Sequence, residues 1–393
     1  MRVALYAGIF KKNQDGATRS LYELVDSLLA NDIETAVWGF SITPQKHKNL
    51  RLFKVPSVPL IGYPEYRLTL NNLNSDLELR RFKPDVVHVS VPDLVGVQFS
   101  WFARQQNLPL VYTFHTDFPS YLRYFKMGSL YHISWTLLKG FYNQGDAVFA
   151  PSDEYVGKLR SQGIERVRSW SRGIHTEHFN PGYRSEELRK SWNVTNERVI
   201  LYSGRLVWFK NLEAVIHVYK RFSEEQPGRV KFVIAGEGPI RQELENRMPE
   251  AHFTGHITGA QLSEAYASSD LFLFPSVTEA FGNVVLEALA SGLPVVVSNV
   301  GGCQEIARKS GGGLITPADD PENFYRSCRT LLDDPLLFMK LRESGLAYAS
   351  RQSWKTINQE IIGTYAELIS SRPEEPPKTE LFKPVIDLIR PNN

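Results

Sequence analysis

The chain alternates short apolar runs with segments whose apolar residues recur at helical spacing. This alternation is typical of parallel α/β layers, because a buried parallel strand is a short apolar run and its crossover helix carries an apolar stripe. The first helix is expected to bury a stripe made of Leu21, Leu24, Val25 and Leu28. In the first half, strands are expected at Val3–Ala7, Glu34–Gly39, Arg51–Val55, Asp85–Val89, Leu110–Phe114 and Ala147–Ala150.

The alternation pauses in a polar, turn-rich stretch at 179–182, which is the expected linker between two domains. A second series of strands is then expected at Val199–Tyr202, Val230–Ala235, His252–Thr254, Leu271–Phe274 and Val295–Ser298. Two consecutive α/β halves, 1–180 and 185–350, predict two Rossmann-like domains that face a cleft, where ligands of such folds bind.

The C-terminal end differs from the rest of the chain. Three helical stretches cover about 321–370, and the last, 351–370, is a candidate to cross back to the first domain. Beyond it, 371–393 is a proline-containing tail for which a frayed end is expected.

Composition narrows the function classes. At 393 residues, with 42% hydrophobic and 22% charged residues, the chain fits two globular domains rather than a disordered protein. Its formal net charge of +2 predicts no nucleic-acid partner. The two cysteines, Cys303 and Cys328, are too few for a disulfide framework and lack metal-site spacing. No apolar run approaches the ~20 residues that cross a bilayer, and the first is expected to be a strand rather than a signal peptide. We therefore predict a cytoplasmic protein, with a peripheral position on the inner face of the membrane as a candidate.

Two glutamates carry the strongest chemical signal. Glu279 and Glu287 bracket a turn from a predicted strand into a helix, and Gly282 between them permits close backbone approach. The new helix offers free N–H groups to an anion, and Glu287 lies about two turns from Glu279. One carboxylate can therefore address a sugar and the other a ribose, with phosphates over the amides between them. The alternative is a solvated helix face that carries two glutamates.

Two cations follow the first strand of the second half. Arg205 and Lys210 lie in a strand–loop–helix passage, where such side chains can clamp a diphosphate. Taken alone, they are equally well explained as surface cations. Glycine turns at 235–239 and 299–302 are weak signals separately, but the order of these motifs is specific.

The motifs from Arg205 to Gly302 resemble the donor-binding half of glycosyltransferase family 4, whose enzymes have the B-type fold. The resemblance extends over about 1–370 through His88, His115 and the segment 171–174. It implies retaining transfer of a hexose from a UDP- or GDP-linked sugar to a hydroxyl acceptor, with no metal and no other cofactor. The domain 1–180 would then bind the acceptor and the domain 185–350 the nucleotide sugar.

The resemblance also implies roles for individual residues. Arg205 and Lys210 would hold the diphosphate, Glu287 the ribose and Glu279 the hydroxyls of the transferred sugar. His115 would reach the sugar beside the departing diphosphate, although a structural strand-end histidine is the rival explanation. The remaining donor contacts would come from Gly16 and from the backbone of Phe281, Gly282 and Asn283.

Two positions depart from the family pattern. Relatives have a paired glycine in the first loop, where this chain keeps only Gly16, so phosphate or acceptor contacts there are less well supported. The linker signature Gly-Val-Asp here ends in His175, which removes an acidic group and weakens any hinge or capping role.

Charge neutralisation supports a metal-free reaction. A leaving diphosphate develops negative charge that must be neutralised by a metal ion or by fixed cations and amides. The sequence has the cations, and it has no convincing Asp-x-Asp pair at a predicted strand end. We expect front-face substitution, in which the departing phosphate oxygen accepts the acceptor's proton.

The acceptor is less well defined. Aromatic and basic residues mix at 118–126 and at Trp135, Lys139, Phe141 and Tyr142, as in segments that meet lipid headgroups. The segment 115–119 also resembles enzymes that glycosylate glycerolipids or phosphatidylinositol. A lipid acceptor and an anionic membrane surface are therefore candidate partners, and the alternative is that these aromatics are core. A soluble carbohydrate acceptor, a noncatalytic sugar-nucleotide-binding protein and an epimerase of the same fold remain open.

Overall fold

The structure, a computed structural model, describes residues 1–11, 16–60, 63–70, 73–115, 117, 119 and 128–372. The chain divides into two compact units, one of Met1–Ser171 with Trp354–Asn393 and one of Arg172–Ser353. The division follows Ser171 rather than the turn at 179–182, because Ile174 and Phe179 pack against the core of the second unit. We call the two parts the N-terminal and the C-terminal unit.

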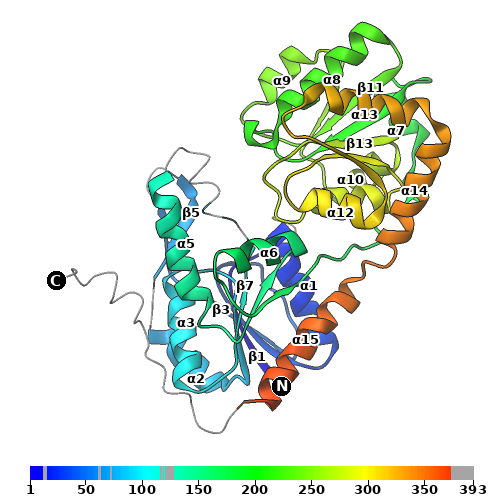
Figure 1. Ribbon diagram of the computed structural model, residues 1–393. Helices are drawn as coiled ribbons and strands as arrows, with labels where there is room; N and C mark the ends of the chain where they lie inside the picture. The colour runs from blue at the N-terminus through cyan, green and yellow to red at the C-terminus, as the bar shows by residue number, and fades with distance from the viewer. Residues whose placement is uncertain are drawn as a thin grey trace. The chain divides into compact units, whose positions relative to one another are not determined.

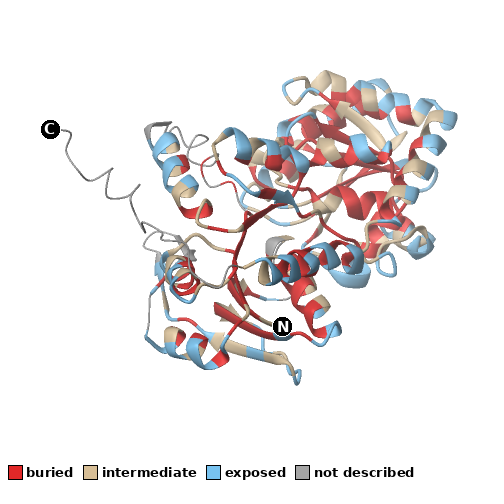
Figure 2. Ribbon diagram, turned by 60° about the horizontal axis from the view of Figure 1, so that its bottom comes forward, coloured by how far each residue is buried: buried red, intermediate tan, exposed pale blue. Residues whose placement is uncertain are grey.

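The N-terminal unit contains a parallel sheet whose strand order is β3-β2-β1-β6-β7-β8-β9 (Figure 1). Its central strands are buried along their whole length, as the near-continuous apolar runs predict (Figure 2). The strands are β1 (Arg2–Phe10), β2 (Glu34–Ile42), β3 (Leu50–Lys54), β6 (Val86–Val89), β7 (Leu110–Thr113), β8 (Ala147–Ala150) and β9 (Val167–Ser169).

An antiparallel hairpin, β4 (Ser57–Leu60) with β5 (Tyr63–Thr69), accompanies this sheet. The sequence does not predict it, because Pro59 and Pro64 interrupt the apolar residues and charged residues follow. Proline is nevertheless tolerated in strands that leave one edge unpaired, as both strands of a two-stranded sheet do.

Helices cover both faces of the N-terminal sheet. On one face, α1 packs against α15, and the stripe of apolar residues predicted for α1 is buried there. On the other, Tyr112 contacts Ser100 of α3 and Phe141 of α5. The helices are α1 (Gly16–Ala30), α2 (Leu73–Phe82), α3 (Leu94–Gln105), α5 (Gly128–Tyr142), α6 (Asp153–Ser161) and α15 (Trp354–Ser370).

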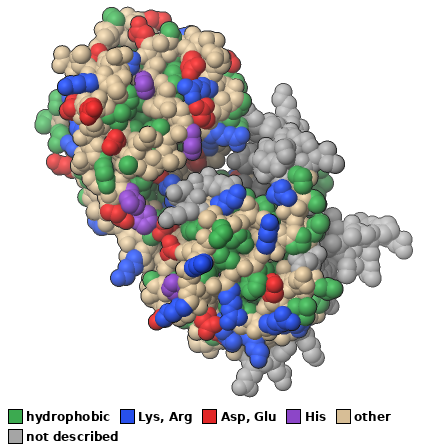
Figure 3. All heavy atoms as spheres, turned by 180° about the vertical axis from the view of Figure 1, so that it is seen from behind, with side chains coloured by type: hydrophobic (Ala, Val, Ile, Leu, Met, Phe, Trp, Pro, Cys, Tyr) green, Lys and Arg blue, Asp and Glu red, His purple; other side chains and the backbone are tan. Residues whose placement is uncertain are grey.

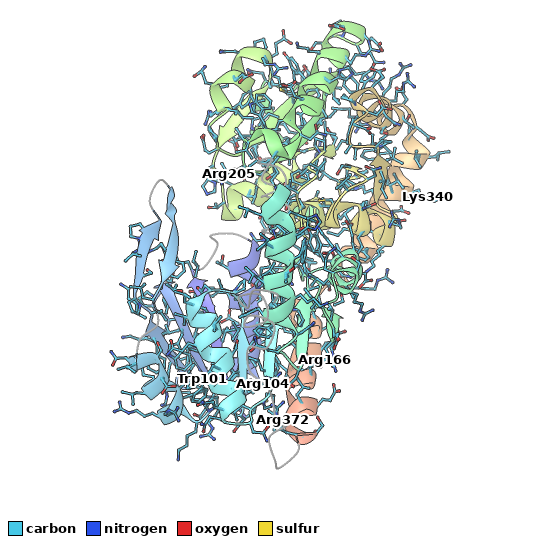
Figure 4. The ribbon with its side chains drawn as sticks, turned by 60° about the vertical axis from the view of Figure 1, so that its left-hand side comes forward. Trp101, Arg104, Arg166, Arg205, Lys340 and Arg372 are labelled. Carbon is cyan, nitrogen blue, oxygen red and sulfur yellow. The ribbon has the colours of Figure 1, made fainter. Side chains whose placement is uncertain are left out.

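The last helix belongs to the N-terminal unit through polar contacts as well as packing. The amide of Asn358 donates to the carbonyl of Glu23 at 2.9 Å, and the hydroxyl of Tyr365 lies 2.6 Å from Nδ1 of the buried His88. Burial lowers the pKa of His88 to about 3, so this imidazole is neutral in the folded protein. Just beyond α15, Arg372 pairs with Asp146 at 2.7 Å (Figure 4).

The C-terminal unit contains a second parallel sheet, in the order β12-β11-β10-β13-β14-β15. Its strands are β10 (Arg198–Ser203), β11 (Val230–Ala235), β12 (His252–Gly255), β13 (Leu271–Phe274), β14 (Val295–Ser298) and β15 (Gly313–Thr316). Its helices are α7 (Glu186–Ser191), α8 (Leu212–Glu225), α9 (Arg241–Arg247), α10 (Gly259–Ala267), α11 (Asn283–Ala290), α12 (Gly302–Ser310), α13 (Pro321–Asp333) and α14 (Pro335–Ala349), with 3₁₀ turns η1 (Pro181–Tyr183) and η2 (Trp208–Lys210). None of the helices in the described ranges is long and apolar enough to cross a membrane.

Candidate active site

The candidate site lies at the carboxyl ends of β10 and β13, which are neighbours in the sheet of the C-terminal unit. Strand order reverses at this point, since β11 and β12 lie on one side of β10 and β13 to β15 on the other. Ligands of open α/β sheets bind at such a switch point. The loop after β10 carries Arg205 and Lys210, and the loop after β13 carries Glu279 and Gly282.

Lys210 and Glu279 contact each other directly. The Nζ of Lys210 donates to Oε1 of Glu279 at 2.5 Å, and the two side chains are only 14% and 25% exposed. The charge of Glu279 also reaches Tyr202, whose hydroxyl pKa is raised mainly by burial and further by this carboxylate. The structure therefore brings together the residues that the sequence assigns to the phosphates and to the sugar.

Asn211 ties the loop after β10 to its neighbours. Its backbone is left-handed, with φ of 58°, and its side-chain amide donates to the carbonyls of Pro275 at 3.3 Å and Ala318 at 2.9 Å. Asparagine is among the few residues that adopt this conformation readily. Because Lys210 immediately precedes it, this tie holds the lysine against the loop of Glu279.

Arg205 is arranged differently from Lys210. Its side chain is exposed at the periphery of the C-terminal unit (Figure 4), and its carbonyl accepts from the Tyr202 hydroxyl at 3.3 Å. Among the residues that the structure describes, no carboxylate forms an ion pair with this guanidinium. Arg205 thus offers a solvated cation, whereas Lys210 shares its charge with Glu279.

The turn before α11 requires glycine. Gly282 has φ of 96°, and a Cβ there would lie 2.4 Å from Sγ of Cys303. The ring of Phe281 is buried in the core, so this residue offers its backbone rather than its side chain to the site. Helix α11 begins at Asn283, and the first amides of a helix attract anions.

A second close approach holds the loop of Glu279 in place. The amide of Gly302 donates to the carbonyl of Glu279 at 2.8 Å, and a Cβ on Gly302 would lie 2.5 Å from Cα of Phe281. The glycine turn at 299–302 therefore packs backbone against backbone.

Glu287 lies on the buried side of α11, away from solvent. It is 3% exposed, and its Oε2 accepts a hydrogen bond of 3.1 Å from the hydroxyl of Tyr266 on α10. The alternative of a solvated helix face is therefore wrong for this glutamate. Tyr266 was not found from the sequence, because nothing in the spacing of α10 relates it to Glu287.

The other predicted site residues belong to the N-terminal unit. Gly16 is the first residue of α1, and its carbonyl accepts from the Ser20 hydroxyl at 2.8 Å. His115 is half-buried after β7, with its ring 5.9 Å from that of Trp170. No finding tests their assigned roles or those of the other site residues, which stay predictions.

The aromatic segment proposed to meet lipid is corrected in part. Trp135, Phe141 and Tyr142 are buried in the core, so they cannot face a membrane. Phe118 and 120–126 lie outside the described residues. The apolar side chains that α5 does expose are aliphatic, namely Leu130, Ile133 and Leu137. Their spacing of three and four residues places them on one face of the helix.

Comparison with known proteins adds to this geometry. The sequence model described as Glycosyltransferase Family 4 matches residues 14–178, and that described as Glycosyl transferases group 1 matches 197–334. A GDP-mannose-dependent alpha-mannosyltransferase of Mycobacterium tuberculosis is 31% identical over 384 residues, which cover 93% of this chain and 96% of that protein. The alpha-monoglucosyldiacylglycerol synthase of Streptococcus pneumoniae is 28% identical, over 75% of this chain and 70% of that protein.

Among solved structures, sucrose-phosphate synthase from Thermosynechococcus elongatus is similar with a TM-score of 0.75 at 19% identity, covering 94% of this chain and 99% of that one. The two parallel α/β units and this likeness show the B-type fold. The chain belongs to glycosyltransferase family 4.

Proposed function

We propose that the enzyme transfers a hexose from a nucleoside diphosphate sugar to a hydroxyl acceptor with retention of configuration. The observation that carries this proposal is the Lys210–Glu279 pair, which lies in the loops beside the amino end of α11 while the same helix carries the buried Glu287. The cation, the amino end of the helix and the two carboxylates match the diphosphate, ribose and sugar of a nucleotide sugar.

Each part of the donor has a candidate partner. The diphosphate would lie against the first amides of α11, with Arg205 and Lys210 neutralising its charge. Glu287 would accept from the ribose hydroxyls, and Glu279 from those of the transferred sugar. A diphosphate that draws Lys210 toward itself would release Glu279 from the ion pair, which couples phosphate binding to sugar binding.

The chemical step proposed is front-face substitution. The bond from the sugar C1 to the phosphate oxygen breaks, and a bond from C1 to the acceptor oxygen forms on the same face. The departing phosphate oxygen accepts the acceptor's proton, while Arg205 and Lys210 stabilise the charge that remains. In this proposal the fixed cations take the place of a metal ion, and His115 contacts the sugar.

A membrane lipid is the proposed acceptor. The exposed aliphatic face of α5, with Ile133 51% and Leu137 54% exposed, supports this choice, as does the relative that is named for a diacylglycerol product. Figure 3 shows apolar side chains on one face of the N-terminal unit, with Lys and Arg among them. Apolar contact with basic neighbours suits an anionic bilayer surface.

Nucleotide release tests the proposal. The protein is incubated with UDP-glucose, UDP-galactose and GDP-mannose, with a lipid extract, with a soluble glycan or with neither, and the free nucleoside diphosphate is measured. We expect release from one donor that depends on lipid and falls in Arg205→Ala. Release with a soluble glycan alone would show that the acceptor is a soluble carbohydrate and not a lipid. Release with inversion at the sugar C2 would indicate an epimerase. No release from any donor would contradict transfer.

A further inference from the structure

We infer that Tyr266 is a positioning residue for the nucleotide ribose, because it fixes the orientation of the Glu287 carboxylate. This inference rests on the proposed assignment of Glu287 to the ribose. The hydroxyl of Tyr266 donates to Oε2 of Glu287 at 3.1 Å across the interface of α10 and α11. Both side chains are buried, so the contact is shielded from solvent.

The ring of Tyr266 is held rigidly within the C-terminal unit. It is fully buried between two aromatic rings, that of Phe179 at 5.8 Å in a T-shaped arrangement and that of Phe272 at 5.6 Å. Phe272 belongs to β13, the strand whose following loop carries Glu279. The phenol hydroxyl therefore has a fixed position relative to the candidate donor site.

A hydrogen-bond donor in a fixed position matters because a carboxylate on its own is loosely oriented. The terminal torsion of a glutamate side chain is broad and roughly two-fold, so only an external contact selects one orientation. A carboxylate that is already oriented loses less freedom when it accepts from a hydroxyl of the ligand. Removal of the Tyr266 hydroxyl should weaken contacts to the ribose hydroxyls and leave contacts to the phosphates unchanged.

The test separates ribose contacts from phosphate contacts. By calorimetry we would measure the Kd of UDP, GDP and ADP and of their 2′,3′-dideoxy forms. We define the ribose preference as the Kd of the dideoxy form divided by that of the ribose form. The nucleotide that the wild type binds most tightly is then measured with Tyr266→Phe, which keeps the ring packing and removes only the hydroxyl.

We expect the ribose preference of Tyr266→Phe to fall by about tenfold or more, the scale of one hydrogen bond to a charged group. The Kd of the dideoxy form should not change, and Glu287→Gln should abolish the preference. Tyr325→Phe is the matched control, because the buried Tyr325 also donates to a glutamate, Glu225, between α13 and α8. Its ribose preference should equal that of the wild type.

Three results would overturn the inference in distinguishable ways. If Glu287→Gln abolishes the preference and Tyr266→Phe retains it in full, Tyr266 has no positioning role although Glu287 still binds ribose. If the wild type itself shows no ribose preference, the assignment of Glu287 fails and the inference fails with it. An equal fall in Tyr325→Phe would show a general loss of stability instead of positioning.

Discussion

At the residue scale, two residues that the sequence indicates separately as site candidates contact each other directly. Lys210 and Glu279 are 69 positions apart and form an ion pair of limited exposure. Sequence motifs indicate each residue as a candidate, but not the contact, because it depends on the left-handed Asn211 and on its hydrogen bonds to two other loops. The same limit applies to Tyr266, which meets Glu287 only through the packing of α10 on α11.

The ion pair predicts non-additive kinetics. Lys210→Ala and Glu279→Gln should each lower kcat, the lysine change by about 10²–10³-fold, the scale of one preorganised charge stabiliser. The double variant should lose clearly less than the product of the two losses, because each single change leaves a partly buried charge without its partner. Steady-state kinetics of the four proteins measure this coupling, and additive losses would contradict it.

At the element scale, most strands were predicted from the sequence, and their order in the two sheets required the structure. Fully buried runs such as Ala147–Ala150 and Leu271–Phe274 are bounded as expected, since an apolar run of only four residues between turns is too short for a helix and suits a buried strand. The short β9 and β15 and the proline-containing hairpin of β4 and β5 were missed, because none of them has four consecutive apolar residues without a proline. Motif order indicated the strand-to-helix turn at Gly282, and the contact with Cys303 required the structure.

That turn provides a prediction for α11. In Gly282→Ala, the alanine would have to adopt a positive φ and its Cβ would press on Sγ of Cys303, so the loop must shift. We expect a loss of about 1–3 kcal/mol in the free energy of unfolding and weaker binding of the nucleoside diphosphate. Gly363→Ala on α15 is the control, since nothing lies within 4 Å of its added Cβ. Denaturant unfolding and calorimetry measure both variants, and equal behaviour of the two would contradict the account.

The exposed face of α5 provides a second prediction at this scale. Ile133→Glu with Leu137→Glu should reduce sedimentation with anionic liposomes and slow transfer to lipid, because it puts charge where apolar contact is proposed. Binding of the nucleoside diphosphate should not change. Leu336→Glu on α14, an aliphatic side chain that is also exposed, is the control and should sediment like the wild type. Full sedimentation of the double variant would contradict the proposed contact of α5 with the membrane.

At the scale of the whole molecule, the buried His88 predicts how stability depends on pH. Its pKa is about 3 in the folded protein because of burial, against about 6.5 in an unfolded chain. As pH falls from about 6.5 toward 3, the unfolded chain binds a proton that the folded chain does not. This group should therefore lower the free energy of unfolding by about 1.4 kcal/mol per pH unit in that window.

Urea unfolding of the wild type and of His88→Gln at pH 7, 6, 5 and 4 measures this contribution. At pH 7 the variant should be less stable, because His88 hydrogen-bonds to Tyr365 and Thr113 in the core. The difference between the two proteins should shrink as pH falls, since glutamine does not titrate. A constant difference across the four pH values would show that His88 does not titrate as described.

The central claim is retaining transfer stabilised by fixed cations, and the anomeric configuration of the product tests it most directly. The lipid product formed from the accepted α-linked donor in the presence of EDTA would be isolated and its anomeric carbon–proton coupling measured by NMR. We predict an α-linked product, formed at the same rate with and without EDTA. A β-linked product, or activity that is lost on chelation and restored by Mg²⁺ or Mn²⁺, would contradict the account.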